Sequence, residues 1–170
     1  PPGEIAFQDF NRFLPASNST QSFMAAPVIF EGKSLGILIV QIGPEQLNAI
    51  MTDNSGMGQS GNTFIVGQDY LMRTDSAEGQ AHTVAASFAN PEQGKADYSA
   101  ARMALNKQTG VEVLTSITGE EVMSAFTPVN VLGTQWALIA ELDESEALAS
   151  AHSLQKTALL VVIIAITAIL

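Results

Sequence analysis

The sequence predicts an α+β fold in which antiparallel strands form sheets with helices packed beside them. Two observations carry this prediction. Runs rich in β-branched and aliphatic residues follow one another closely and are separated by short turns that contain glycine, as at Glu31-Gly32-Lys33. Between these runs lie stretches of helical character, of which residues 82–107 are the longest. Strands joined by such short turns pair antiparallel, because a parallel connection needs a dozen or more residues.

The N-terminal part of the chain predicts a helix, two strands and a second helix, in that order. Residues 4–14 carry Ala, Phe and Leu at the spacing of one helix face and favour an amphipathic helix. Residues 22–30 and 34–42 are the strands. The second strand is apolar at nearly every position, which is typical of a central strand covered on both faces. Pro44 suits the first position of the next helix.

The rest of the chain predicts a loop, a hairpin, short helices and a three-stranded meander. The loop is residues 53–62, the hairpin pairs residues 63–66 with 70–73, the helices lie within 82–107, and the strands are 111–117, 120–127 and 134–142. Asp143 with Glu146 resembles a capping box and predicts a helix that continues into the apolar C-terminal residues. Trp136 alternates with aliphatic residues on its strand, which indicates a role in core packing.

An internal repeat accompanies this order of elements. Residues 26–28 (Ala-Pro-Val), a glycine-containing turn and residues 38–42 lead into a helix. Residues 127–129 (Thr-Pro-Val), a similar turn and residues 138–142 lead into another. The similarity predicts two copies of one sheet-then-helix unit, although two unrelated hairpins of similar composition remain an alternative.

We therefore expect three parts: residues 1–52 as the end of one module, residues 53–142 as a complete second module, and residues 143–170 as a helix that starts to cross a membrane. No charged residue follows Lys156, and residues 158–170 are aliphatic apart from Thr167. A bilayer span needs about 20 apolar residues. The alternative is a buried C-terminal core helix.

Composition excludes several classes of function. The chain of 170 residues has 7 Lys and Arg against 17 Asp and Glu, a net charge of −10, which argues against binding of nucleic acid. It has no Cys, which excludes thiol catalysis, zinc ribbons, iron–sulfur clusters and disulfides. His82 and His152 are the only histidines and are far apart, so we expect no metal site, no Ser–His–Asp triad and no cofactor.

Residues 56–61 match the pattern G-x-G-x-x-G. A dinucleotide site needs this loop after a strand and at the start of a helix, so that the pyrophosphate meets the helix N-terminus. Here the loop follows a predicted helix and precedes a predicted strand. The order of elements therefore favours a linker between modules over a nucleotide site.

The candidate ligand-binding residues are Tyr70, Arg73 and Asp75. They lie close together in the sequence at the end of a predicted strand, and Arg73 is one of only three arginines. An Arg side chain binds a small carboxylate or phosphate with two hydrogen bonds, and a nearby Tyr hydroxyl and Asp can complete a polar pocket. The alternative is that Arg73 pairs with Asp69 or Asp75 and only holds the loop.

Three segments resemble the Cache family of sensor modules. Residues 22–28 with 35–42 resemble the end of one module, residues 61–76 resemble the opening hairpin of the next, and residues 133–141 resemble its closing strand. The resemblance implies the double-Cache region of a bacterial transmembrane receptor, such as a methyl-accepting chemotaxis protein or a sensor kinase, with PAS-like antiparallel sheets. Amino-acid-sensing members tend to carry an Asp on the strand that closes the membrane-distal module, where this chain has Gln41.

The function predicted on this basis is that of a ligand-sensing input domain without enzymatic activity. Residues 1–156 would be extracytoplasmic, in the periplasm, and the C-terminal helix would enter the inner membrane and carry a ligand-induced shift. The expected partners are a small anion or organic acid and a second copy of the chain. The alternatives are a membrane-anchored solute-binding module without signalling output, and a tethered hydrolase that uses Asp75 or the Glu120-Glu121 pair.

Overall fold

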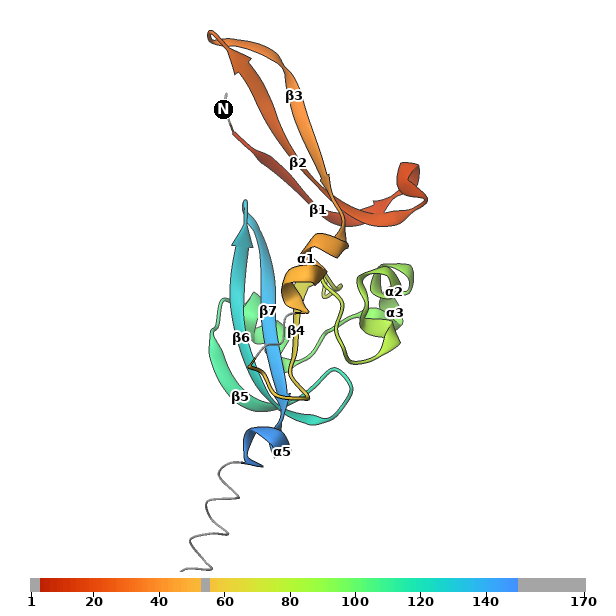
Figure 1. The fold of residues 1–170 in the computed structure, drawn as a ribbon, viewed down its shortest axis with the longest axis vertical. Coiled ribbons are helices and arrows are strands. Elements are labelled where there is room, and N and C mark those ends of the chain that lie inside the picture. The colour runs from red at the N-terminus through yellow and green to blue at the C-terminus, as the bar shows by residue number, and fades with distance from the viewer. Residues whose placement is uncertain (1–3, 53–55, 150–170) are drawn as a thin grey trace, which may run out of the picture.

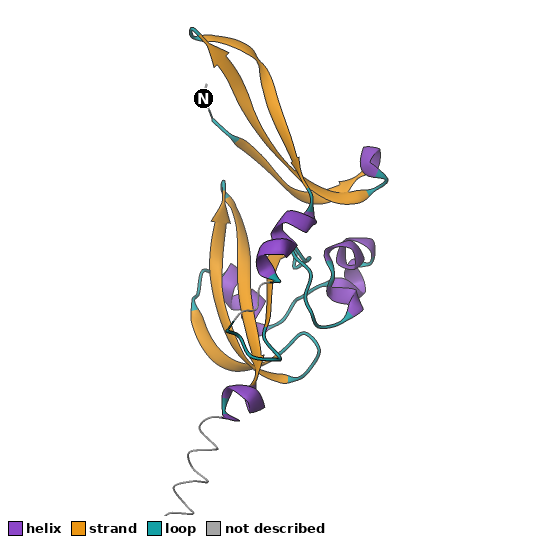
Figure 2. Ribbon diagram, viewed as in Figure 1, coloured by secondary structure: helices purple, strands orange, loops and turns teal. Residues whose placement is uncertain are grey.

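The computed structural model describes residues 4–52 and 56–149. Two antiparallel sheets follow each other along the long axis of the molecule, with helix α1 between them (Figure 1). The strands are β1 (Ala6–Phe13), β2 (Ser19–Phe30), β3 (Lys33–Ile42), β4 (Asn62–Gly67), β5 (Gly110–Thr115), β6 (Glu121–Val131) and β7 (Thr134–Asp143). The helices are η1 (Leu14–Ala16), α1 (Pro44–Met51), η2 (Gln80–His82), α2 (Val84–Ala89), α3 (Pro91–Gly94), α4 (Ser99–Leu105) and α5 (Glu144–Ala147). The predicted α+β class is confirmed (Figure 2).

The main core lies between the four-stranded sheet, in the order β4-β7-β6-β5, and the helices that follow β4. Helix α4 packs on β6 and β7. Three alanines of α4 are fully buried, and their small side chains allow the helix to approach the sheet closely while favouring the helical backbone. The completely buried core residues are Phe64, Val66, Met72, Ala96, Ala100, Ala101, Ala104, Ala137 and Ile139.

The predicted helix over residues 4–14 is wrong, because most of this segment forms strand β1, which pairs with β2. Gln8 pairs with Phe23 and Asn11 pairs with Gln21, so the two residues Asp9 and Phe10 lie opposite one residue of β2. Such a bulge adds one residue to the strand and interrupts the alternation of its faces. Phe7 and Phe10 therefore both contact the same ring, that of Trp136, although their spacing of three is typical of a helix.

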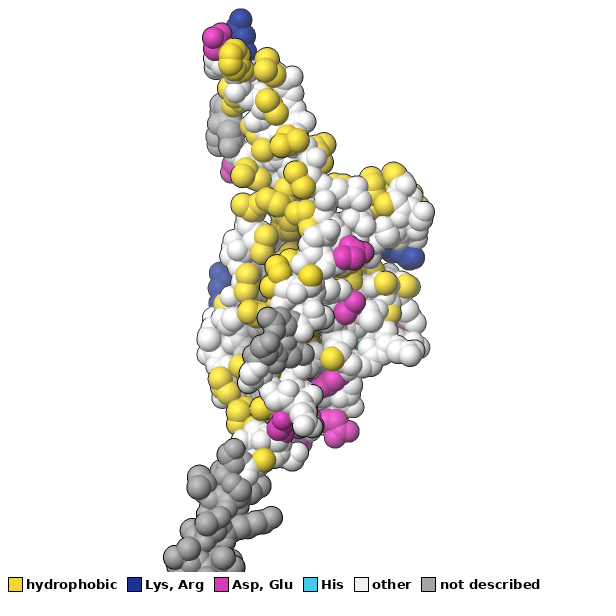
Figure 3. Space-filling model, viewed as in Figure 1, with side chains coloured by type: hydrophobic (Ala, Val, Ile, Leu, Met, Phe, Trp, Pro, Cys, Tyr) yellow, Lys and Arg dark blue, Asp and Glu magenta, His cyan; other side chains and the backbone are white. Residues whose placement is uncertain are grey.

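The prediction that residues 34–42 form a central strand covered on both faces is also wrong for the described part of the chain. Strand β3 lies at the edge of the three-stranded sheet, in the order β1-β2-β3. Ile37 is 70% exposed and Ile39 is 63% exposed. Apolar side chains follow this sheet over much of the surface seen in Figure 3. Neither face of β3 has a covering layer within residues 4–52 and 56–149, although its composition is that of a buried strand.

The internal repeat reappears as two antiparallel hairpins, of which the first has a register shift between Val28 and Ile29 and the second has none. In the first hairpin Pro27 pairs with Ile37, and in the second Pro128 pairs with Ala137. The strands predicted at residues 111–117, 120–127 and 134–142 are present as β5, β6 and β7. The hairpin predicted at residues 63–66 and 70–73 is only partly present: its first arm is β4, but its second arm forms no strand and makes a single isolated bridge, between Val66 and Met72.

The C-terminal helix is described only at its start. Helix α5 begins after Asp143, but the side chain of Asp143 does not cap it, so the predicted capping box is absent. Within residues 4–52 and 56–149, no helix has the length and hydropathy needed to cross a bilayer. The apolar residues 158–170, on which the membrane prediction depends, lie outside the described residues.

Candidate functional site

Arg73 lies at the contact between the two sheets. The chain leaves β4 at Gly67, turns and returns beside it, so that the backbone N–H of Arg73 donates to the carbonyl of Ile65 at 2.7 Å. The side chain then passes directly over Gly67, where a Cβ atom would collide with the guanidinium. Only 2% of Arg73 is exposed. A glycine at position 67 is therefore what leaves room for the guanidinium.

The main partner of Arg73 is Asp9, on the bulge of β1. Nε of Arg73 donates to Oδ1 of Asp9 at 2.9 Å and Nη2 donates to Oδ2 at 2.7 Å, which is the two-bond geometry that Arg forms with a carboxylate. Nη1 donates to the carbonyl of Leu71 at 2.9 Å and pairs with Asp69 at 3.0 Å. Each guanidinium nitrogen therefore already has a partner within the protein.

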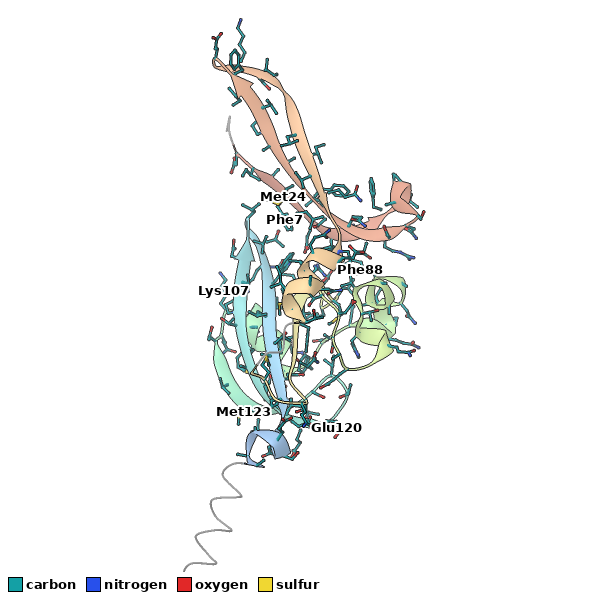
Figure 4. All side chains as sticks on the ribbon, viewed as in Figure 1. Phe7, Met24, Phe88, Lys107, Glu120 and Met123 are labelled. Atoms are coloured by element: carbon teal, nitrogen blue, oxygen red, sulfur yellow. The ribbon has the colours of Figure 1, made fainter. Side chains whose placement is uncertain are left out.

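Trp136 and Phe88 complete this contact, which we call the junction: Asp9, Asp69, Arg73, Phe88 and Trp136. Nε1 of Trp136 lies 3.2 Å from each carboxylate oxygen of Asp9 and donates to them. The guanidinium carbon lies 5.4 Å from the centre of the Phe88 ring. Burial alone would lower the pKa of Arg73, but the hydrogen bonds to Asp9 and Asp69 outweigh it and leave the pKa raised. Figure 4 labels Phe88 and Phe7 near the region where the two sheets meet.

The other two predicted ligand-binding residues make separate contacts. Tyr70 adopts a left-handed backbone conformation in the turn after β4, with φ of 63°. Oδ2 of Asp75 accepts from Nδ2 of Asn48 at 2.8 Å, and Oδ1 accepts from the backbone N–H of Val84 at 2.7 Å, so Asp75 connects α1 to the start of α2. Five pockets among the described residues have linings that do not include Tyr70, Arg73 or Asp75. The structure thus places the three residues in neighbouring contacts within the protein.

A second polar cluster lies inside the four-stranded sheet, at Glu141. Glu141 is paired in register with Asn62 of β4 on one side and with Ser124 of β6 on the other, so the three side chains form a row on the face covered by helices. Only 1% of Glu141 is exposed. The hydroxyl of Tyr98, just before α4, donates to Oε1 of Glu141 at 2.7 Å.

The environment of this cluster shifts two pKa values. Burial raises the pKa of Glu141 to about 7, and the negative charge of Glu78 adds to the rise, while the hydrogen bond from Tyr98 opposes it. The pKa of Tyr98 is raised by burial and by the charge of Glu141, so its hydroxyl stays a hydrogen-bond donor. The sequence did not reveal this cluster, because the face of β7 that carries Glu141 also carries Gln135 and Asp143, whereas the opposite face is apolar apart from Thr134. The signal was the alternation, which puts Glu141 on the face of Ile139 and Ala137.

The glycine-rich loop at residues 56–61 binds a carboxylate of the chain itself. Backbone N–H groups of Gln59 and Ser60 donate to Glu146 of α5 at 2.8 and 2.9 Å, and the Ser60 hydroxyl donates to it at 2.5 Å. These hydrogen bonds lower the pKa of Glu146. Gly58 has φ of 75°, and a Cβ atom there would collide with the Glu146 side chain. The loop therefore connects the segment between α1 and β4 to the beginning of α5.

The comparisons with known proteins give matches of structure only. No family model matches the sequence, and no curated protein matches it. The periplasmic sensory domain of the Campylobacter jejuni chemoreceptor Tlp1 is similar with a TM-score of 0.57 at 12% identity, over 83% of this chain and 50% of that domain. The ligand-binding domain of the Pseudomonas aeruginosa PAO1 amino acid chemoreceptor PctB, in complex with L-Arg, is similar with a TM-score of 0.55 at 17% identity, over 86% of this chain and 57% of that domain.

A third similar structure belongs to another kind of receptor. The extracellular domain of mmHK1S-Z3, described as a histidine kinase, has a TM-score of 0.54 at 15% identity, over 89% of this chain and 53% of that domain. The chain thus spans about half the length of the solved structures that it matches. The fold of this chain is that of periplasmic and extracellular sensory domains, as the Cache resemblance implied.

Proposed function

We propose that the chain belongs to the extracytoplasmic ligand-sensing input domain of a transmembrane signal-transduction receptor and that it has no enzymatic activity. The observation that carries the proposal is the shared fold, which extends over 83–89% of this chain and recurs in receptors of two kinds, chemoreceptors and a histidine kinase. Because a fold alone does not determine a function, the proposal depends on the tests below.

We propose that residues 4–52 are part of a membrane-distal module and that residues 56–142 form the membrane-proximal one. Two observations support this division. All buried residues of the hydrophobic core except Phe10 belong to the second part. The first part has a sheet with exposed apolar side chains, among them Leu35, Ile37 and Ile39, which is the composition of a sheet covered on both faces. We propose that another part of the receptor covers this sheet, since the chain spans only about half the length of the similar structures.

The junction is the proposed connection between the two modules. A ligand that favours one arrangement of the distal sheet would change the position of Asp9, and Asp9 contacts both Arg73 and Trp136 of the proximal module. Trp136 lies on β7, which leads directly to α5. A shift along β7 and α5 is the proposed output, and it requires only that the ligand binds the two arrangements with different affinity.

The experiment that tests the proposal is ligand-dependent thermal unfolding of the chain with a panel of amino acids, organic acids and small anions. Binding to the folded state alone raises Tm, by an amount that grows with ligand concentration. We expect at least one small carboxylate to raise Tm, and isothermal titration calorimetry then gives its Kd. A panel in which no compound raises Tm contradicts ligand sensing by this chain.

The same assay separates two roles of Arg73. If Arg73 contacts the ligand, as the sequence predicts together with Tyr70 and Asp75, Arg73→Ala abolishes the rise of Tm. If Arg73 only holds the junction, the variant lowers Tm with and without ligand by the same amount. The contacts within the protein favour the second outcome. Arg102→Ala, at an exposed arginine, is the matched control.

A further inference from the structure

Glu141 is a buried carboxyl group without a cationic partner. It lies on β7, which is flanked by β4 and β6 and covered by α4. Among the described residues, no Lys or Arg forms an ion pair with it, in contrast to Arg73 at the junction. A buried carboxylate that lacks a counter-charge is costly, and the usual response is uptake of a proton.

Two polar atoms of this cluster lack a hydrogen-bond partner. One is Oε2 of Glu141 and the other is the hydroxyl oxygen of Ser124, whose residue is fully buried. The two residues are direct partners across β6 and β7. The Ser124 hydroxyl is close enough to affect the pKa of Glu141, yet the two side chains form no hydrogen bond of acceptable geometry. Buried polar atoms are rarely left unpaired, so each such atom requires an explanation.

We propose that Glu141, Ser124 and Tyr98 form an internal proton-binding site through which the module responds to the pH of its surroundings. A proton taken up from solvent forms an O–H bond at Oε2 of Glu141. That O–H group then donates to the Ser124 hydroxyl oxygen, while Oε1 continues to accept from the Tyr98 hydroxyl. One proton is bound and the charge of the site changes from −1 to 0, and no other reactant takes part.

The surrounding groups favour proton uptake. Glu78, in the segment before η2, adds a negative charge near Glu141. His82 of η2 interacts with Glu78. From β4 and β6 the groups that face Glu141 are the uncharged side chains of Asn62 and Ser124. Asp143 follows two residues later on β7, and Glu146 of α5 is engaged by Gln59 and Ser60.

The position of the site gives its titration a structural consequence. Glu141 lies two residues before the end of β7, where the strand leads to α5. Loss of the proton leaves a negative charge in the buried sheet, and Oε2 of Glu141 can then no longer donate to Ser124, while Tyr98 still donates to Oε1. We therefore expect the ionised form to have a looser contact between β7 and β6 at Ser124. The response goes beyond ligand sensing and requires no ligand.

The test is an NMR titration of the Glu141 side-chain carboxyl carbon in the chain of 170 residues, assigned through the backbone. We expect a midpoint near pH 7 rather than near 4.5, and amide shifts at Tyr98, Ser124 and Asn62 that follow the same curve. Glu112→Gln is the matched control, because Glu112 is the other register partner of Ser124 but is exposed. It should leave the midpoint of Glu141 unchanged.

A second variant makes the test independent of Glu141 itself. Tyr98→Phe removes a hydrogen bond that stabilises the ionised form, so it should move the midpoint to higher pH. A Glu141 midpoint below pH 5 would falsify the proposal. A midpoint near 7 without any accompanying amide shift also overturns it, because the module then binds a proton without responding.

Discussion

The junction allows a prediction that can be worked out in some detail. Asp9→Asn keeps the shape of the side chain but removes its charge and places an NH₂ group where one carboxylate oxygen accepted from Arg73. Removing one partner of a buried ion pair costs roughly 3–5 kcal/mol of unfolding free energy, because the other charge stays buried. Asp69 remains at 3.0 Å from Arg73, and the side chain of Asp9 is 21% exposed. We therefore expect the lower end of the range, about 3 kcal/mol.

The assay is thermal unfolding followed by the fluorescence of Trp136, the only tryptophan of the chain. For a chain of this size about 3 kcal/mol corresponds to a decrease in Tm of roughly 6–12 °C. Because Trp136 donates to Asp9, its emission should also change in the folded state when the junction opens. Asp97→Asn is the matched control: it breaks the exposed pair of Asp97 with Arg102 and should leave Tm within experimental error. An equal effect of the two variants would refute the reasoning.

Three further predictions follow from the remaining contacts. Trp136→Phe keeps an aromatic ring beside Phe7 but removes the donation to Asp9, and should lower the unfolding free energy by about 1–2 kcal/mol in urea. Glu141 has a folded-state pKa of about 7 against an ordinary value of 4.5. Its bound proton therefore stabilises the fold below pH 4.5, and this contribution to the unfolding free energy, about 3 kcal/mol, is lost as pH rises to 7. Glu141→Gln should abolish this pH dependence of the unfolding free energy, measured in urea between pH 5 and 8. Ser60→Ala removes the acceptor of the Asp143 amide, whose hydrogen exchange should accelerate about fivefold, whereas Ser145→Ala should leave it unchanged.

The meander of β5, β6 and β7 was predictable because residues close together in the sequence determine where its strands end and how they pair. Glycine-containing turns mark the ends of its strands, and each turn is short enough to impose antiparallel pairing. Strand β1 was not predictable in this way. Its apolar residues have helical spacing only because the bulge at Asp9 and Phe10 interrupts the alternation of a strand, and no turn signal indicates a bulge.

The candidate site was predictable to a similar degree. Arg73 stood out as a rare arginine among acidic residues, and its pairing with Asp69 is the local contact that the sequence offered. Its main partner, Asp9, lies 64 residues away, and only the packing of the two sheets brings them together. Glu141 was missed for a related reason: it lies on the more polar face of β7, and only the position of α4 shows that this face is buried.

The bulge in β1 makes the length of this strand more important than its composition. Deleting either Asp9 or Phe10 would restore regular pairing with β2, because one residue of β1 would then lie opposite one residue of β2. Deletion of Asp9 would remove the main partner of Arg73, and deletion of Phe10 would remove a ring that packs beside Trp136. Substitutions at Gln8 or Asn11 would leave the number of residues in β1 unchanged. Homologous chains that keep the junction should therefore tolerate substitutions in β1 more readily than insertions or deletions.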